Sequence, residues 1–161
     1  MVTLLTTPAD RELVITRTFD APPGLLWEAW TRPEHVRAWY GVSALTTSVV
    51  DIDLRVGGAW RWGQSTPEGQ EIVFSGTYEE IVPAERLDYT EVFEQMPDAD
   101  PVRVTLTFDA TPDGGTALTS TSVWPSNEIR DQALAAGMEA GVREQFDRLA
   151  GHLRTMRPVH G

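Results

Sequence analysis

The sequence predicts an α+β fold in which a seven-stranded, curved antiparallel sheet wraps around a long C-terminal helix. Between residues 12 and 124, segments of alternating apolar and polar residues are separated by turns that contain Gly or Pro, which is typical of hairpin-linked strands. From residue 127 onward the apolar residues recur every three or four positions, which is typical of an amphipathic helix. The chain has 161 residues, 41% of them hydrophobic, and this length and apolar content fit one compact domain.

The first expected elements are one strand and two short helices. We expect residues 1–10 to form a flexible tail. Residues 12–20 alternate and are rich in β-branched side chains, so they predict the first strand. The two prolines at positions 22 and 23 predict the start of a helix, because Pro suits the first helical turn. A second short helix follows and is expected to end before Gly41.

Six further strands and one helix complete the expected order. The strands are expected at residues 46–56, 60–64, 71–82, 86–93, 102–109 and 116–124. A β-bulge is expected in the longest of them, because Tyr78 and Ile81 both look inward-facing yet are out of phase. The helix is expected to span residues 127–154 without a break, with Asn127 as its N-cap.

The predicted architecture implies a cavity. One helix cannot cover a wide curved sheet completely, so space is expected between the two, where ligands bind in many proteins. The single domain is expected to span residues 11–155, and residues 156–161 are expected to be a second tail.

Composition excludes several classes of function. The formal net charge is −11, so we expect no nucleic-acid partner and no binding to an anionic membrane surface. The chain has no Cys and no Lys, which excludes thiolate catalysis, a Lys Schiff base and a Walker phosphate loop. The three His residues have no metal-ligand spacing, and no nucleotide-binding fingerprint occurs, so we expect neither a metal nor another cofactor. No signal peptide is recognisable, and we expect a cytoplasmic protein.

Five segments carry a family resemblance, in this order: RTFDAPPGLLWEAWTRPEHVRAWYG, VVDIDLRVGGAWRW, FSGTYEEIVPAERLDYTE, VTLTFDATPDGGTALTST and GMEAG. Together they resemble the START-like (SRPBCC) superfamily, and within it the branch of Hsp90 ATPase activator homologues. The resemblance covers residues 11–155 and implies a helix-grip fold with a deep apolar pocket. Many relatives carry Trp where this chain has Val142, which leaves space in the pocket unless Trp60 or Trp62 fills it.

The alternation of the strands predicts which side chains face the helix. The expected inward set is Ile52, Leu54, Val56, Trp60, Trp62, Phe74, Tyr78, Leu87, Tyr89, Phe93, Val104, Leu106, Phe108 and Leu118. Each aromatic residue has two explanations, core packing or contact with a ligand. As ligand-binding candidates we take Trp39, Trp60, Trp62, Phe74, Phe93, Ser120, Met138 and Val142.

Glu91 is the principal catalytic candidate. It shares a strand face with Leu87 and Tyr89 and should point inward, where desolvation would raise its pKa toward neutrality. The alternative is that Glu91 lies at a solvated pocket mouth or pairs with an Arg. Tyr78 and Tyr89 are expected to assist by hydrogen-bonding to a substrate carbonyl.

Three functions remain open from the sequence. The first is the binding of a hydrophobic small molecule between the sheet and the C-terminal helix. The second is a cofactor-independent cyclase, aromatase or dehydratase that acts on a polyketide-like substrate. The third is a protein-partner module, similar to a chaperone co-regulator, for which a filled cavity is expected. A monomer and a homodimer are both compatible with the sequence.

Overall fold

The computed structural model describes residues 3–96 and 98–156. The predicted C-terminal tail lies outside the described residues except for Met156, with which the last helix ends. Four helices occur in the described ranges: α1 (Pro23–Thr31), α2 (Pro33–Trp39), α3 (Asn127–Ala135) and α4 (Met138–Met156). The strands of the same ranges are β1 (Leu4–Thr6), β2 (Glu12–Phe19), β3 (Thr46–Ile52), β4 (Ala59–Ser65), β5 (Glu71–Val82), β6 (Arg86–Phe93), β7 (Val102–Ala110) and β8 (Thr116–Val123).

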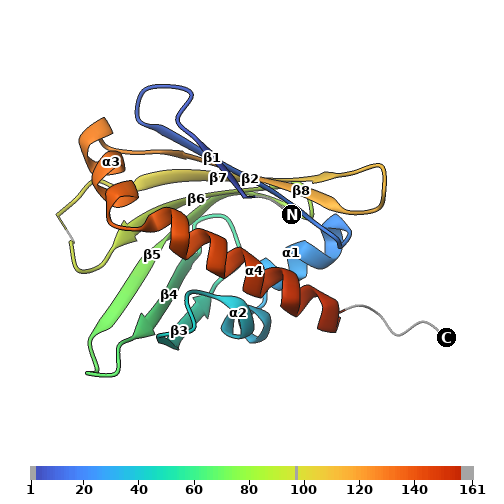
Figure 1. Cartoon of the computed structure of the whole chain (residues 1–161), viewed down its shortest axis with the longest axis horizontal. Helices are drawn as coiled ribbons and strands as arrows, with labels where there is room; N and C mark the ends of the chain where they lie inside the picture. Colours follow the sequence, from blue (N-terminus) through green and yellow to red (C-terminus); the bar gives the residue numbers. More distant parts are fainter. Residues whose placement is uncertain (1–2, 97, 157–161) are drawn as a thin grey trace.

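These strands form one antiparallel sheet in the order β1-β2-β8-β7-β6-β5-β4-β3. The sheet bends, and α4 crosses in front of it, with α1 and α2 beside the C-terminal half of α4 (Figure 1). The predicted α+β class, the curved antiparallel sheet and the two short helices after the first long strand are therefore confirmed. The predicted bulge is also present, because the β5–β6 register shifts between Tyr78 and Glu80.

The predicted number of seven strands was wrong, since the described sheet has eight. The additional strand is β1, which lies in the segment expected to be a flexible tail. Leu5 pairs with Ile15 of β2 at the edge of the sheet and packs against the core, whereas Leu4 is exposed. A three-residue edge strand is too short to show an alternation, which is why the sequence pattern did not indicate it.

The predicted single C-terminal helix was also wrong, because α3 and α4 are separate. The chain breaks at Gly137, whose φ of +100° is in the left-handed region that favours glycine. The N-cap of α3 is Ser126 and not Asn127, because the Ser126 hydroxyl accepts a hydrogen bond of 3.1 Å from the N–H of Ile129. The apolar spacing continues across the break, so periodicity could not reveal it.

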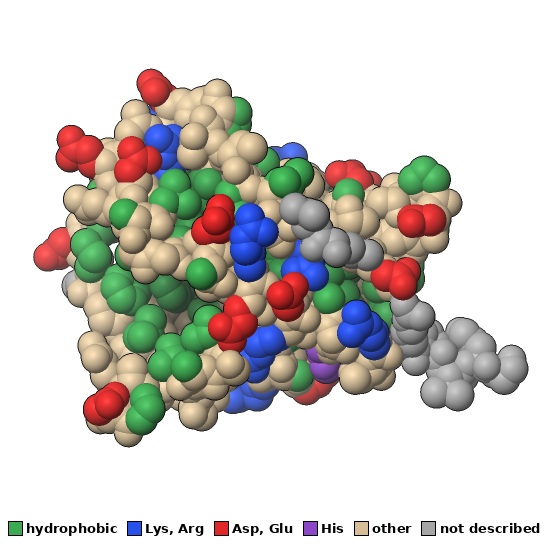
Figure 2. Space-filling view, viewed as in Figure 1, with side chains coloured by type: hydrophobic (Ala, Val, Ile, Leu, Met, Phe, Trp, Pro, Cys, Tyr) green, Lys and Arg blue, Asp and Glu red, His purple; other side chains and the backbone are tan. Residues whose placement is uncertain are grey.

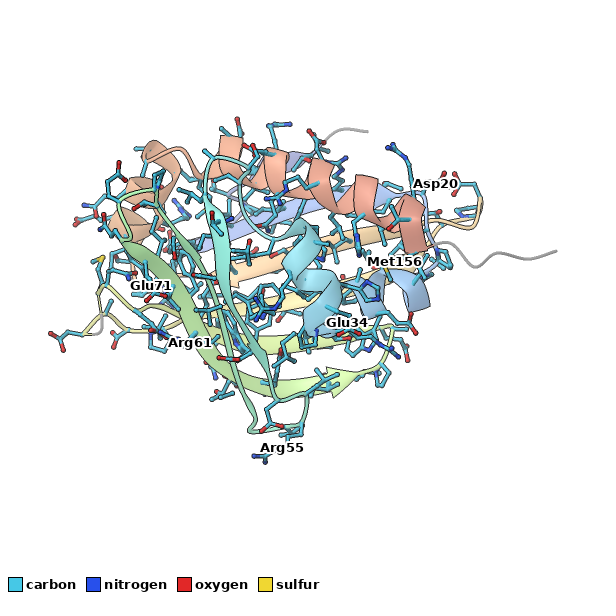
Figure 3. The ribbon with its side chains drawn as sticks, turned by 90° about the horizontal axis from the view of Figure 1, so that it is seen from below. Asp20, Glu34, Arg55, Arg61, Glu71 and Met156 are labelled. Carbon is cyan, nitrogen blue, oxygen red and sulfur yellow. The ribbon has the colours of Figure 1, made fainter. Side chains whose placement is uncertain are left out.

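Two residues of the expected inward set lie elsewhere. Leu54 and Val56 are 40% and 65% exposed. The last β3–β4 pair joins Ile52 to Trp60, so both residues lie in the turn after the strand, although the apolar alternation continues into it. Seen from below, Arg55 lies at the tip of this turn and points away from the space between α4 and the sheet (Figure 3).

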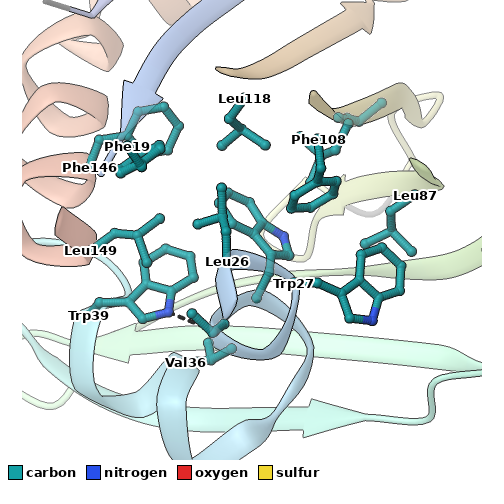
Figure 4. Close-up of a cluster of buried hydrophobic side chains, with 14 of the residues drawn as sticks. Phe19, Leu26, Trp27, Val36, Trp39, Leu87, Phe108, Leu118, Phe146 and Leu149 are labelled. Carbon is teal, nitrogen blue, oxygen red and sulfur yellow. Dashed lines mark hydrogen bonds between the residues drawn. The ribbon is translucent and has the colours of Figure 1, made fainter. Parts of the chain in front are cut away.

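The core is most densely filled around the two short helices. Leu26, Val36 and Trp39 are fully buried against Leu149 of α4, and the Trp39 indole N–H donates to the carbonyl of Ala29 at 2.8 Å (Figure 4). These side chains form a close-packed part of the core. The open space lies toward the N-terminal half of α4.

Candidate functional site

Two adjoining cavities lie between the sheet and α4. The first, here called the aromatic cavity, has a volume of about 80 Å³ and is lined by Trp30, Tyr40, Trp60, Trp62, Tyr78, Leu87, Tyr89, Glu91 and Gln145. The second cavity has a volume of about 160 Å³ and is lined by Leu13, Ile15, Val104, Leu106, Ser120, Ser122, Trp124, Met138, Val142 and Phe146 together with Trp30, Tyr89, Glu91 and Gln145. These last four residues belong to both walls, so the two cavities are neighbours. Figure 2 shows hydrophobic side chains around a hollow beside the N-terminal half of α4.

Six aromatic rings form most of the wall of the aromatic cavity. Three neighbouring pairs meet at steep angles: Trp60 and Trp62 at 71°, Trp60 and Tyr89 at 81°, and Tyr40 and Trp62 at 73°, whereas Trp30 and Trp62 are tilted at 49°. The ring centroids of the three steep pairs are 5.3–5.7 Å apart, which is the distance of favourable edge-to-face contacts. The rings therefore stabilise one another in a fixed arrangement, and they do so without filling the space between them.

Glu91 lies on β6 at the boundary between the two cavities. It follows Leu87 and Tyr89 on one face of the strand and pairs with Val102 of β7 in the sheet. Its side chain has no hydrogen bond or ion pair with any other described residue, so the alternative of an Arg partner is wrong for the described part of the chain. Burial raises the pKa of Glu91 to about 7. Its side chain is half-buried and not sealed from solvent, and it lines both cavities, so Glu91 can hold or release a proton near neutral pH.

Several hydrogen-bonding groups around Glu91 also lack partners within the described ranges. The hydroxyls of Tyr40, Tyr78 and Tyr89 make no hydrogen bond there. Burial raises the pKa of each of these tyrosines above its usual value, so all three stay protonated and remain donors. The indole N–H of Trp62 is buried without a partner, whereas that of Trp60 donates to the carbonyl of Thr90 at 3.1 Å. A buried donor without a partner, such as the Trp62 indole N–H, is uncommon and is expected where a ligand or water completes it.

The residues of α4 complete the second cavity and hold one edge of the first. Met138 and Val142 line the second cavity, and Val142 leaves open the space that a larger side chain would occupy. Gln145 accepts a hydrogen bond of 3.0 Å from the N–H of Gly41 through its carbonyl oxygen. Arg148 donates to the carbonyl of Tyr40 at 3.1 Å. These contacts fix the connection that carries Tyr40, and so α4 positions that side of the aromatic cavity.

Most, but not all, of the predicted site residues lie at these walls. Trp60, Trp62, Tyr78, Tyr89, Glu91, Ser120, Met138 and Val142 line one or both cavities. Trp39 does not, because it is fully buried behind the wall, where its ring packs against Trp30 at 4.9 Å and Trp62 at 6.0 Å. Phe74 and Phe93 do not either, since they stack on each other at 5.1 Å.

The wall residues that were not among the predicted ones are Trp30 and Gln145 in the aromatic cavity and Leu13, Ile15, Trp124 and Phe146 in the second. Trp30 comes from α1, and its helical pattern gave no sign that it reaches across to the sheet. Gln145 follows Val142 by three positions, so helical spacing places it on the same face.

A pair of histidines lies outside the site, between α2 and α4. Nδ1 of His35 is 2.9 Å from Nε2 of His152, although 117 positions separate them. Partial burial lowers the pKa of His152, and the neighbouring His35 lowers it further. The described residues contain no group of three or more His, Asp or Glu side chains that could hold a metal ion. Among their helices, none has the length and apolar character needed to cross a membrane.

The chain resembles solved structures over nearly its whole length. A protein of Rhodobacter sphaeroides has a TM-score of 0.88 and 25% identity over 96% of this chain and 99% of its own. A protein of Nitrosomonas europaea has a TM-score of 0.79 and 24% identity over 90% and 95%. CalU16 of Micromonospora echinospora has a TM-score of 0.65 and 22% identity over 95% and 87%. The last two resemblances show the fold alone.

Family comparison agrees with the fold. No curated protein matches the chain. The model of the family described as Activator of Hsp90 ATPase homolog 1-like protein matches residues 20–154. The chain therefore belongs to this family, within the START-like (SRPBCC) superfamily.

Proposed function

We propose that this protein binds a small molecule with an apolar body in the two adjoining cavities, and that Glu91 contacts its polar end. The observation that carries the proposal is the unpaired carboxylate of Glu91 in an otherwise aromatic wall. Superfamily members generally bind ligands, which supports the proposal. The cavities also favour it over a protein-partner module, for which a filled interior was expected.

The energetics of the site support the same conclusion. An apolar pocket with a few convergent polar groups is the usual architecture of a small-molecule site. Here the polar groups are one carboxylate and several donors that have no protein partner in the described residues. A ligand that satisfies these groups and covers the aromatic rings would replace contacts that the protein alone leaves unmade.

The test compares the binding of a probe by the unmodified chain with its binding by a variant whose second cavity is filled by a larger side chain. The probe is para-tert-butylphenol, and its binding is monitored through the quenching of Trp fluorescence. Val142→Trp is expected to weaken binding at least tenfold, because its side chain lines the second cavity. Arg143→Trp is the matched control, since Arg143 is exposed on the same helix and is expected to bind as the unmodified chain does. Equal binding by both variants, or no binding of any apolar probe, contradicts the proposal.

One observation favours a second candidate function. A carboxyl group with a pKa of about 7 can both accept and donate a proton at neutral pH, which a cofactor-independent cyclase, aromatase or dehydratase requires. In such a reaction Glu91 would remove a proton next to a carbonyl that Tyr78 and Tyr89 orient, and the same acid would protonate the leaving hydroxyl as water. An aromatic β-hydroxyketone is a suitable probe, because its dehydration gives an absorbing enone. Glu91→Gln should bind this probe and fail to dehydrate it. Turnover equal to that of the unmodified chain would exclude Glu91 as the acid–base group.

A further inference from the structure

The geometry points to an organic cation as the ligand of the aromatic cavity: an ammonium head group on an apolar body. This inference rests on the proposed function, because it names the class of molecule held at that same site. It is carried by the arrangement of the rings and by the single charge among them.

The rings have the arrangement of an aromatic cage. Three Trp and three Tyr side chains surround a space of about 80 Å³. Steep angles between neighbouring rings make them walls of a box rather than a parallel stack. A cation within about 6 Å of such ring centroids is attracted by the negative faces, most strongly by Trp, and the attraction grows when water is excluded.

The charge of the site has one sign. Glu91 is the one charged side chain among the residues that line the two cavities. A neutral apolar ligand would leave this carboxylate unpaired at alkaline pH, whereas a cation would compensate it. The attraction is strong in a desolvated site because the effective dielectric constant there is low. The whole chain adds a favourable background, since its formal net charge is −11.

The two cavities divide the ligand between them. The head group belongs in the aromatic cavity beside Glu91, and the apolar body extends past the shared residue Tyr89 into the second cavity. There Leu106, Val142 and Phe146 provide an apolar surface. The unpartnered N–H of Trp62 is available to an oxygen atom close to the head group.

A cation on Glu91 must also displace its proton, which gives the site a pH dependence of defined sign. The titratable groups that share the aromatic cavity are Tyr40 from the α2–β3 connection, Tyr78 from β5 and Tyr89 from β6, and all three stay neutral well above pH 7. The groups that α1, α4, β2, β4, β7 and β8 contribute to the two walls are uncharged. Arg17, buried further along β2, lines neither cavity and pairs with Asp147 of α4 at 2.7 Å. Cation affinity should therefore rise with pH through the titration of Glu91, and the affinity for a neutral ligand should not.

The experiment compares two isosteric probes by titration calorimetry on the full chain: (para-hydroxyphenyl)trimethylammonium and para-tert-butylphenol. At about pH 8, where Glu91 is charged, we expect the cation to bind at least tenfold more tightly than its neutral isostere. The preference should shrink several-fold at about pH 5.5, and near pH 7 the cation alone should release protons to the buffer.

Two variants distinguish the specific contribution of Glu91 from the general attraction of an acidic chain for a cation. Glu91→Gln should lose the preference for the cation and keep the neutral probe, which also shows that the variant is folded. Glu94→Gln is the matched control on the same segment, because Glu94 pairs with Arg61 and lines neither cavity. It should retain the preference.

The outcomes also separate this inference from the function on which it rests. Equal affinities of the two probes at alkaline pH, or a preference for the neutral one, overturn the cation site and leave the small-molecule function standing. The cation site is also overturned if Glu91→Gln retains the preference for the cationic probe. Failure of both probes to bind contradicts the small-molecule function together with the cation site.

Discussion

Replacement of Glu91 by Gln should stabilise the protein at alkaline pH. Gln has nearly the same shape and carries no charge, so the variant removes the desolvation of the carboxylate and little else. The pKa of Glu91 rises from 4.5 to about 7 on folding, and desolvation is the cause. At about 1.4 kcal/mol per pKa unit, the charged form destabilises the folded chain by at most about 3 kcal/mol, because the half-buried side chain keeps part of its solvation.

The sign and the pH window follow from proton linkage. A raised pKa means that the folded state binds the proton more tightly than the unfolded state does. The stability of the unmodified chain therefore falls, relative to that of Glu91→Gln, as pH rises from about 4.5 to about 7, and the difference is constant above that range. Below it, both states carry the proton and the two proteins should be nearly equally stable.

The measurement is urea unfolding of both proteins, followed by Trp fluorescence at several pH values between about 4.5 and 8.5. The difference between their unfolding free energies isolates Glu91, because all other titrating groups are common to both. Glu94→Gln is the control of opposite sign, since its bidentate hydrogen bonds of 2.8 and 2.9 Å with Arg61 lower the pKa of Glu94. A difference for Glu91→Gln that does not change with pH, or that favours the unmodified chain at alkaline pH, would refute the reasoning.

Three other substitutions test features of the fold. Gly76→Ala should lower the unfolding free energy by at least about 3 kcal/mol, because its Cβ would collide with the carbonyl of Thr90, and chemical denaturation measures this loss. Ser126→Ala should cost about 1 kcal/mol in the same assay through loss of the α3 N-cap, and an unchanged midpoint would argue against the cap. The lowered pKa of His152, due to burial and then to His35, predicts a loss of stability as pH falls below about 6.5. His152→Gln should remove this loss in melting curves, and identical acid profiles of the two proteins would contradict it.

The sequence pattern predicted the directions of side chains better than their positions along the sheet. Alternation placed Glu91 on the inward face with Leu87 and Tyr89, and the structure has all three at the wall of the aromatic cavity. The same alternation placed Phe93 inward, yet that residue lies beyond the end of the cavity against Phe74. A period of two reports the face of a strand and contains no information on where the covering helix crosses it.

Contacts between distant elements were the least accessible to sequence reasoning. Trp39 was expected to bind the ligand, but its N–H donates to the carbonyl of Ala29 and its ring fills the core instead. Trp30 lies at the cavity wall instead, although both residues lie on short helices that begin with Pro. The two were indistinguishable because the difference depends on how α1 and α2 pack against each other, which is a tertiary property.

Packing alone does not explain the carboxylate at position 91. Gln would fill the same volume, keep a hydrogen-bonding group in the wall and avoid a penalty of up to about 3 kcal/mol. That penalty is a large fraction of the roughly 5–15 kcal/mol that stabilises a typical domain. A local conflict of this size is expected at a site that serves binding or chemistry, where function opposes stability. A cationic ligand resolves the conflict from outside the chain, because the charge that destabilises the empty protein becomes the group that holds the ligand.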